Sequence, residues 1–492
     1  MTSSETSLGK DATDDANQRE PQEYRQDNSD SLMRVVTQYT EYSVSHANEE
    51  DIERLERERE EKMAKEQQGP VKMGFLSKKY AQHRRKFFKQ YAVIIVVLWI
   101  FILSVFSIYW GAMYQRGSRL VNLKILLVVE DGASIDNNDY PVSQALLQVA
   151  ESPAVKPLLG WTRHDYVDED WVVNEVWKQK YWGAIYVTSN NVSQQLVQAL
   201  ENGRDLNTSM LVKGYYETGR DLNGMNSYVE PGLLKFGVAF TDIMQQEVYP
   251  RLLSQLSSEQ FASLQNTTTL SRTPDITMTD GIPVSDYTVM APLQVGLIYI
   301  IIVTFFQVMW FQKINQEAAE TLKPVSYIIY RMVIAQANFL LISLGYSCVN
   351  AAFQIKLNNA WKGGFGVHWM ISYLTMSAVG GANENIALLC FAVLPPLMGF
   401  WLVFFVVCNI SATFSPIEVC PQFYRFTYAM PIKNSYELMK VLLFDTYRGH
   451  LGRNFGILVA WIALNNILLP FCLFFFSWHM KRKLTKAAQK SH

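Results

Sequence analysis

A single carboxylate flanked by two amides lies between two apolar runs in the last quarter of the chain. The three residues are Asn383, Glu384 and Asn385, and Gly380 and Gly381 precede them. Within a membrane, an ionisable group is costly and usually functional. In a tight cytosolic loop, an asparagine could instead cap the helix that follows. Both placements are open, and the three residues are the candidate transport or functional site.

The glycines beside this group allow close helix approach or a tight turn. The Glu384 carboxylate could therefore face a polar cavity entered from the cytosol, and we predict that it serves function rather than folding. Pro395 and Pro396 follow within the next apolar run. Paired prolines kink a helix and free backbone carbonyl groups, which would shape a cavity or a hinge.

Motifs for enzymatic chemistry are lacking. The sequence has no glycine-rich phosphate loop that ends in Lys and Ser or Thr, and no Gly-x-Ser-x-Gly elbow. Its seven histidines and five cysteines show no metal-ligand spacing. We therefore predict that the protein is not an enzyme. We expect no metal, no cofactor and no nucleic-acid partner.

The elements around these residues are predominantly apolar. A helix needs about 20 apolar residues to cross the hydrocarbon core of a bilayer. Six runs approach or exceed that length, at residues 91–114, 289–311, 332–355, 365–382, 386–414 and 455–478. The sequence therefore predicts a membrane protein with a bundle of six transmembrane helices.

Basic residues set the orientation, because Lys and Arg near membrane helices stay on the cytoplasmic side. Clusters of them precede the first helix and fill the tail 479–492. Both termini are therefore predicted to be cytoplasmic, with residues 115–288 and the loop 415–454 outside. Three N-glycosylation sequons lie in the predicted outer segment, at Asn191, Asn207 and Asn266.

Residues 115–288 read as an extracytoplasmic α/β domain between helices one and two. Strands are predicted at 123–129, 182–187 and 210–216. Helices are predicted at 141–151, 168–180, 191–200 and about 232–264, with a break near Pro250. This segment has no cysteine, so it must fold on its apolar core without disulfides.

The N-terminal region has two parts. Residues 1–70 are polar and acidic and are predicted to be disordered, with a charged helix at 48–67 supported by acid–base pairs four residues apart. Residues 71–90 interleave basic and aromatic side chains. That pattern is typical of an amphipathic helix on an anionic membrane surface, or of a simple basic flank to the first crossing.

Several short motifs carry a resemblance to known families. They include the segment 128–132 where the first strand ends, the strand 182–187, the acidic tail, Gly381–Asn385, and the segments 415–418 and 430–437. The chain resembles the fungal nitrosoguanidine-resistance proteins and, in architecture, bacterial phage-infection proteins and the membrane domains of type-two ABC exporters. The resemblance implies drug resistance, export and a role in plasma-membrane phospholipid asymmetry. Unlike ABC exporters, the chain has no nucleotide-binding domain.

Two functions follow from these features. The first is export or redistribution of amphipathic small molecules or phospholipids across the plasma membrane or another secretory-pathway membrane. Its partners would be membrane lipids, amphipathic small molecules, and a separate ATPase docked on the loop 312–331 or a second copy of the chain. The alternative is a non-transporting sensor or regulator whose outer domain binds a ligand or a partner.

Overall fold

The computed structural model describes residues 54, 57, 60, 74–264 and 267–490. The predicted disordered tail and charged helix lie almost entirely outside the described residues, as does Asn266. Two compact units, Met1–Ile94 and Ile95–His492, are described separately.

One long helical stretch begins in the first unit and continues into the second. A short turn at Lys78–Tyr80 leads into α3 (Ala81–Phe101), a π-helical segment (Ile102–Phe106) and α4 (Ser107–Met113). No Pro or Gly occurs between residues 75 and 110, so nothing interrupts the helix near residue 90. Of the predicted surface helix 71–90, residues 78–90 are helical and lead into the first predicted crossing, and residues 71–73 lie outside the described residues.

The segment between the first two apolar helices forms a mixed five-stranded sheet in the described part of the chain. The strands are β1 (Lys124–Val128), β2 (Gly160–His164), β3 (Gly183–Val187), β4 (Val212–Tyr216) and β5 (Ile276–Asp280). Their order is β2-β1-β3-β4-β5. β1 pairs in parallel with β2 and β3, β3 is antiparallel to β4, and β4 is parallel to β5. We call this segment the sheet domain.

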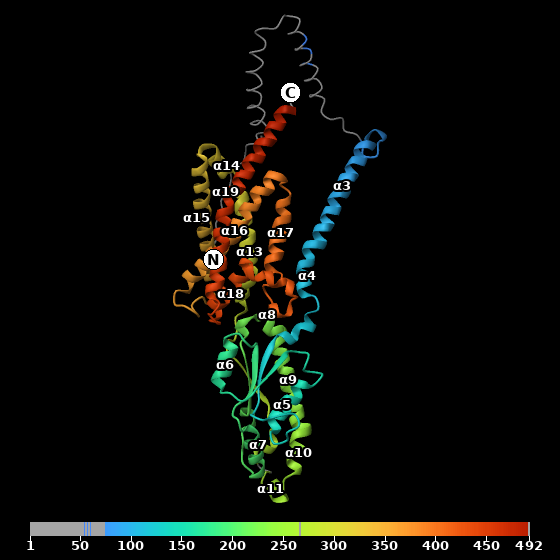
Figure 1. The fold of residues 1–492 in the computed structure, drawn as a ribbon, viewed down its shortest axis with the longest axis vertical. Helices are drawn as coiled ribbons and strands as arrows, with labels where there is room; N and C mark the ends of the chain where they lie inside the picture. Colours follow the sequence, from blue (N-terminus) through green and yellow to red (C-terminus); the bar gives the residue numbers. More distant parts are fainter. Residues whose placement is uncertain (1–53, 55–56, 58–59, 61–73, 265–266, 491–492) are drawn as a thin grey trace, which may run out of the picture. The chain divides into compact units, whose positions relative to one another are not determined.

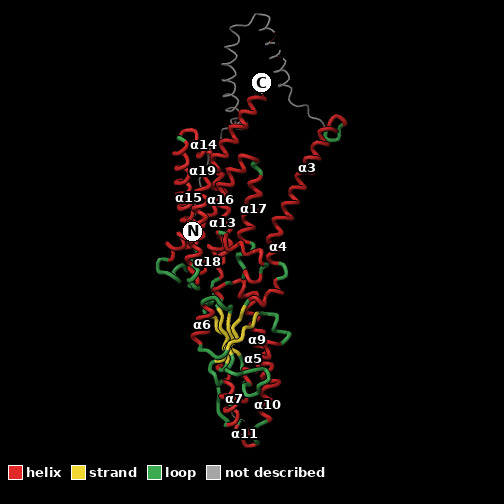
Figure 2. The backbone as a smooth tube through the Cα atoms, in the orientation of Figure 1, coloured by secondary structure: helices red, strands yellow, loops and turns green. Residues whose placement is uncertain are grey.

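Both faces of the sheet are covered by helices, as Figures 1 and 2 show. Side chains alternate along a strand, so Ile125 and Leu127 of β1 pack toward one face and Leu126 and Val128 toward the other. The first face carries α5 (Pro141–Glu151), α7 (Val192–Glu201) and α9 (Glu230–Ile243). The second carries α6 (Glu169–Trp177).

A long helical run completes the first face. α9 continues through a π-helical segment (Met244–Val248) into α10 (Tyr249–Ser254). The helix does not break at Pro250 as predicted. The wider π-helical turn before it removes the clash between the proline ring and the preceding turn. Shorter helices are α8 (Leu222–Gly224), α11 (Ser258–Ser263) and α12 (Thr268–Ser271).

The remaining helices are mostly apolar. Among the described residues, five helical stretches are long and apolar enough to cross a membrane: 78–113, 287–310, 324–352, 364–393 and 451–483. They contain, in order, α3 with α4, α13 (Gly296–Trp310), α15 (Pro324–Ala352), α16 (Gly364–Val393) and α19 (Leu451–Lys490). Such helices are those of a membrane protein. The others are α14 (Gln312–Thr321), α17 (Leu397–Ile410) and α18 (Pro431–Phe444).

The fourth and fifth predicted crossings differ from the structure. A single helix, α16, runs through residues 364–393, so Gly380–Asn385 is not a turn between helices. Pro395 and Pro396 kink no helix, because they lie between α16 and α17. The helix ends before the prolines, as expected where a proline ring clashes with the preceding residue. α17 has 14 residues and falls among the shorter apolar helices.

Helix α16 is the central element of the apolar bundle. It packs against α13, α15, α17, α18 and α19, and about two thirds of its most apolar 18-residue window is buried. The polar side chains near its midpoint, Ser377, Asn383, Glu384 and Asn385, are buried.

Candidate functional site

Three consecutive polar residues of α16 reach three different sides of the bundle. Successive residues of an α-helix are about 100° apart. Asn383, Glu384 and Asn385 therefore cannot share a partner, and each is buried. Together we call them the α16 polar triplet.

Asn383 binds α13 and α17. Its amide Nδ2 donates to the Ile301 carbonyl oxygen at 3.2 Å and to Thr304 Oγ1 at 3.1 Å. Its Oδ1 accepts a hydrogen bond of 3.0 Å from Trp401 Nε1. The amide thus has partners for both its donor and its acceptor group, which favours a structural role in joining helices.

Glu384 forms an ion pair with Arg331 on α15. Arg331 Nε donates to Glu384 Oε1 at 3.0 Å, and a second guanidinium nitrogen bonds the same oxygen. The side chains of Arg331 and Glu384 are only 6% and 10% exposed. Tyr327 Oη, one turn earlier on α15, accepts from Arg331 Nη1 at 3.1 Å. Removing either charge would leave the other buried and unpaired, which is strongly destabilising.

Asn385 contacts α19. Its Nδ2 donates to the Asn465 carbonyl oxygen at 2.9 Å, and Asn465 Nδ2 donates back to the Ala378 carbonyl oxygen of α16 at 2.8 Å. Asn385 Oδ1 is buried and accepts no hydrogen bond among the described residues. A buried acceptor of this kind normally has a partner, so a water molecule is the expected one.

Two glycines set the distances that these contacts need. A Cβ atom at Gly380 would overlap Phe339 Cε1 of α15, and one at Gly381 would lie 2.8 Å from Asn465 Cβ of α19. Both approaches are too close for real carbon contacts. The two glycines therefore allow α15 and α19 to approach α16 closely, as predicted.

A cavity of about 380 Å³ lies on the Arg331 side of the ion pair. We call it the α14 cavity. Its wall combines polar residues from α14, α15 and α19 with apolar residues of α13, α16 and α19. The polar set is Gln312, Asn315, Gln316, Tyr327, Arg331 and Ser477; the apolar set includes Val308, Leu388, Phe391, Leu473, Phe476 and Met480.

A second, much smaller pocket lies on the Glu384 side. Its volume of about 10 Å³ is close to what one water molecule requires. It is lined by Glu384 and Asn385 together with Gln336, Ser377, Asn465 and Asn466. Arg331 lines the larger cavity and Glu384 lines the smaller one, so the ion pair stands between the two.

A second polar network joins the same helices nearer the start of α16. His368 is fully buried. Its Nδ1 lies 2.8 Å from Ser347 Oγ and its Nε2 lies 3.3 Å from Asn350 Nδ2, both on α15. The contact between α15 and α16 is thus polar at two positions, around His368 and around Glu384.

The sequence identified the α16 polar triplet but missed its partner. Arg331 was assigned to the loop 312–331, whereas the structure places it within α15. A signal was present: Arg331 is the only charged residue of 324–352, and Glu384 is the only one of 364–393. Lone opposite charges in two apolar helices are expected to pair.

The remaining predicted residues lie apart from this site. Pro395 and Pro396 line neither the α14 cavity nor the smaller pocket. Asn191 and Asn207 are exposed in the sheet domain. Ser193, the hydroxyl residue of the first sequon, is buried and bonded to Glu130, so any sugar must be added before the domain folds.

Glycine-to-alanine substitutions test the close approach. Alanine normally stabilises a helix interior by about 0.5–1 kcal/mol relative to glycine. At Gly380, the added methyl group meets the Phe339 ring, so we expect a loss of about 1–3 kcal/mol in the free energy of unfolding. Gly399→Ala is the matched control, because no atom lies within 4 Å of the place that its methyl group would occupy. Both variants are measured by unfolding in micelles. Equal changes in their free energies of unfolding would contradict the close packing of Gly380 against Phe339.

Comparisons with known proteins support the membrane assignment. The chain is 30% identical over 444 residues to an uncharacterized endoplasmic reticulum membrane protein of Saccharomyces cerevisiae, covering 86% of this chain and 87% of the relative. No solved structure matches. Residues 94–467 match the model of a family described as "Protein of unknown function (DUF3533)". This region includes the sheet domain and all of α16, and the chain belongs to that family.

Proposed function

We propose that the protein moves amphipathic molecules across the membrane in which it resides. These would be phospholipids, or apolar drugs that carry a polar group. The observation that carries this proposal is the α14 cavity, whose wall is polar along one part and apolar along another. A molecule with a charged head and an apolar tail matches both parts of such a wall.

The path would begin at the α14 cavity and continue between α15, α16 and α19. The Arg331–Glu384 pair separates this cavity from the smaller polar pocket. An ion pair held by two helices can exchange its partners when one helix moves, so it would act as the gate in this scheme. Glu384 then serves both folding and transport, since it also neutralises Arg331.

The proposal includes a topology. α3 with α4, α13, α15, α16 and α19 would cross the membrane, with α17 as a sixth crossing. Fourteen residues make a helix of about 21 Å, shorter than a bilayer core of about 30 Å, so α17 would need local thinning or help from residues 411–414. Both termini would then be cytoplasmic and the sheet domain would lie on the opposite side.

The cellular membrane and the protein partners are proposed from the similar proteins. The yeast relative is named as an endoplasmic reticulum membrane protein, and the resemblance to nitrosoguanidine-resistance proteins favours the plasma membrane. Both belong to the secretory pathway, and we propose a membrane of that pathway. Energy would come from an ion gradient or from a separate ATPase that contacts α14. The ATPase and a second copy of the chain are the protein partners of this proposal.

A sensor or regulator is the second candidate function. It is favoured by a group of buried charges where the sheet domain meets α18, described in the next subsection. A regulator would bind ligand without moving lipid. Reconstitution of the purified protein in liposomes, with and without an ion gradient, distinguishes the two.

Filling the α14 cavity tests the proposed path. Ala319 lines the cavity from α14 and is exposed, so Ala319→Trp adds bulk without disturbing a packed core. We expect translocation of a fluorescent phospholipid in these liposomes to fall at least several-fold. Ile314→Trp, at an exposed position of α14 outside the cavity wall, is the matched control. Full activity of Ala319→Trp would contradict a route through this cavity.

Glycosylation tests the topology. Asn191→Gln and Asn207→Gln each remove an exposed acceptor from the sheet domain. We expect the protein from a eukaryotic host to lose apparent mass on enzymatic deglycosylation, and the mutations to reduce that shift. A new sequon placed in the C-terminal tail should stay unmodified. Glycosylation of the tail together with an unglycosylated sheet domain would show that the topology is the inverse of the proposed one.

A further inference from the structure

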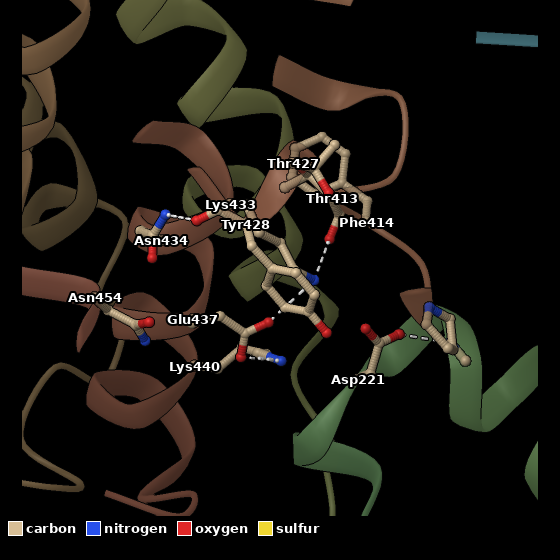
Figure 3. Close-up of polar contacts among 12 residues, drawn as sticks. Asp221, Thr413, Phe414, Thr427, Tyr428, Lys433, Asn434, Glu437, Lys440 and Asn454 are labelled. Atoms are coloured by element: carbon tan, nitrogen blue, oxygen red, sulfur yellow. Dashed lines mark hydrogen bonds and ion pairs between the residues drawn. The ribbon is translucent and has the colours of Figure 1, made fainter. Parts of the chain in front are cut away.

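A polar cavity lies where the sheet domain meets the helices. Its volume is about 160 Å³. One part of its wall comes from the segments before β3 and after β4, and the other from residues 416–453, which include α18. We call it the junction cavity, and Figure 3 shows part of it. It shares no lining residue with the α14 cavity.

Arg220 supplies a buried cation from the sheet domain. Its guanidinium donates to the carbonyl oxygens of Gln179, at 3.1 Å, and Tyr181, and it lies 3.9 Å above the ring of Trp182. Within the described residues, no carboxylate lies within 4.0 Å of it. Burial lowers the pKa of Arg220 to about 10, so the group remains charged at neutral pH. A buried charge without an ion partner is costly.

Two lysines of α18 face the same space. Lys433, Glu437 and Lys440 lie at positions i, i+4 and i+7, on one side of the helix. Glu437 bonds both lysines, at 3.1 and 2.8 Å. One carboxylate thus serves two ammonium groups, each less than a tenth exposed. Lys440 Nζ also donates to the Arg220 carbonyl oxygen at 2.8 Å, which connects α18 to the sheet domain.

Nearby carboxylates offset much of this positive charge without forming an ion pair with Arg220. The lining contains four basic residues, Arg220, Lys433, Lys440 and Arg453, against three acidic ones, Asp221, Glu418 and Glu437. These three and Glu217 act on Arg220 through space, and Asp221 Oδ1 also accepts a hydrogen bond of 2.7 Å from the Gly224 amide. Arg453, at the exposed rim, lies 5.6 Å from the ring of Tyr428 and forms no ion pair among the described residues. His450 adds a further titratable group.

We propose that the junction cavity binds a phosphate group, either the headgroup of a phospholipid or a small soluble phosphate compound. Arginine and lysine together are the side chains that bind phosphate in proteins, the first through its planar fork and the second as a point charge. A bound phosphate would give Arg220 the direct ion pair that it lacks among the described residues, and it would share the two lysines with Glu437. The site is distinct from the proposed transport route and does not depend on it.

Binding there would strengthen the contact between the sheet domain and the helices. One phosphate would be held by Arg220 from the sheet domain and by Lys433 or Lys440 from α18, with Arg453 as a third basic group at the rim. A ligand that binds only the folded arrangement stabilises it according to its concentration relative to its Kd. Ligand binding in the cavity would thus couple the sheet domain to the helical bundle.

The test uses the purified full-length protein in detergent micelles. Thermal unfolding is followed with inorganic phosphate, glycerol phosphate or short-chain phosphatidic acid, against potassium chloride at matched ionic strength. We expect a saturable rise in Tm with at least one phosphate. A rise with all three compounds indicates a site for free phosphate, and a rise with phosphatidic acid alone indicates a lipid headgroup. No rise with any of them would overturn the proposal.

Two variants decide whether the rise comes from this cavity. Arg453→Gln removes a rim charge that has no ion partner among the described residues, so folding should be unaffected while the apparent Kd weakens about tenfold, the effect of roughly 1.4 kcal/mol. Lys362→Gln removes an exposed charge outside the cavity and should leave the Kd unchanged. Equal Kd values for Arg453→Gln and the unmodified protein would place the phosphate elsewhere and contradict the assignment.

Discussion

Hydrocarbon offers no hydrogen bonds, so the polar groups of a buried membrane helix need partners within the protein. The helix α16 carries three such groups in succession, and each is met by a different neighbour: α13 and α17, α15, and α19. The rotation of about 100° between successive residues makes one short segment sufficient to orient four helices. The arrangement of the bundle depends on this segment.

The same contacts shape the space that we propose for transport. Gly380 and Gly381 bring α15 and α19 close to α16, which lets Arg331 reach Glu384. The ion pair then closes one end of the α14 cavity and borders the smaller polar pocket. Stability and function therefore meet in the same side chains. Glu384 cannot be assigned to function alone, because its carboxylate neutralises a buried guanidinium.

Apolarity located four of the five long apolar helices among the described residues, at 78–113, 287–310, 324–352 and 451–483. The interpretation of Gly380–Asn385 as a turn was wrong, because tertiary contacts keep this run helical although glycine and asparagine favour turns. Its alternative, a position at membrane depth, stays a prediction. The edge strands β2 and β5 were missed because their partly exposed sequences, such as Gly160–His164, lack a strong apolar signal. Lys433 and Lys440 were placed in an outer loop, since only folding shows that α18 is buried.

Arg331 and Glu384 act as one unit that holds α15 to α16. A double-mutant cycle measures this directly, with Glu384→Gln, Arg331→Gln and the double variant compared by reversible unfolding in micelles. We expect each single change to cost about 3–5 kcal/mol, and the double variant to lose clearly less than the sum, with a coupling energy of about 2–3 kcal/mol. Additive losses would show that the two residues are energetically independent and would contradict the account.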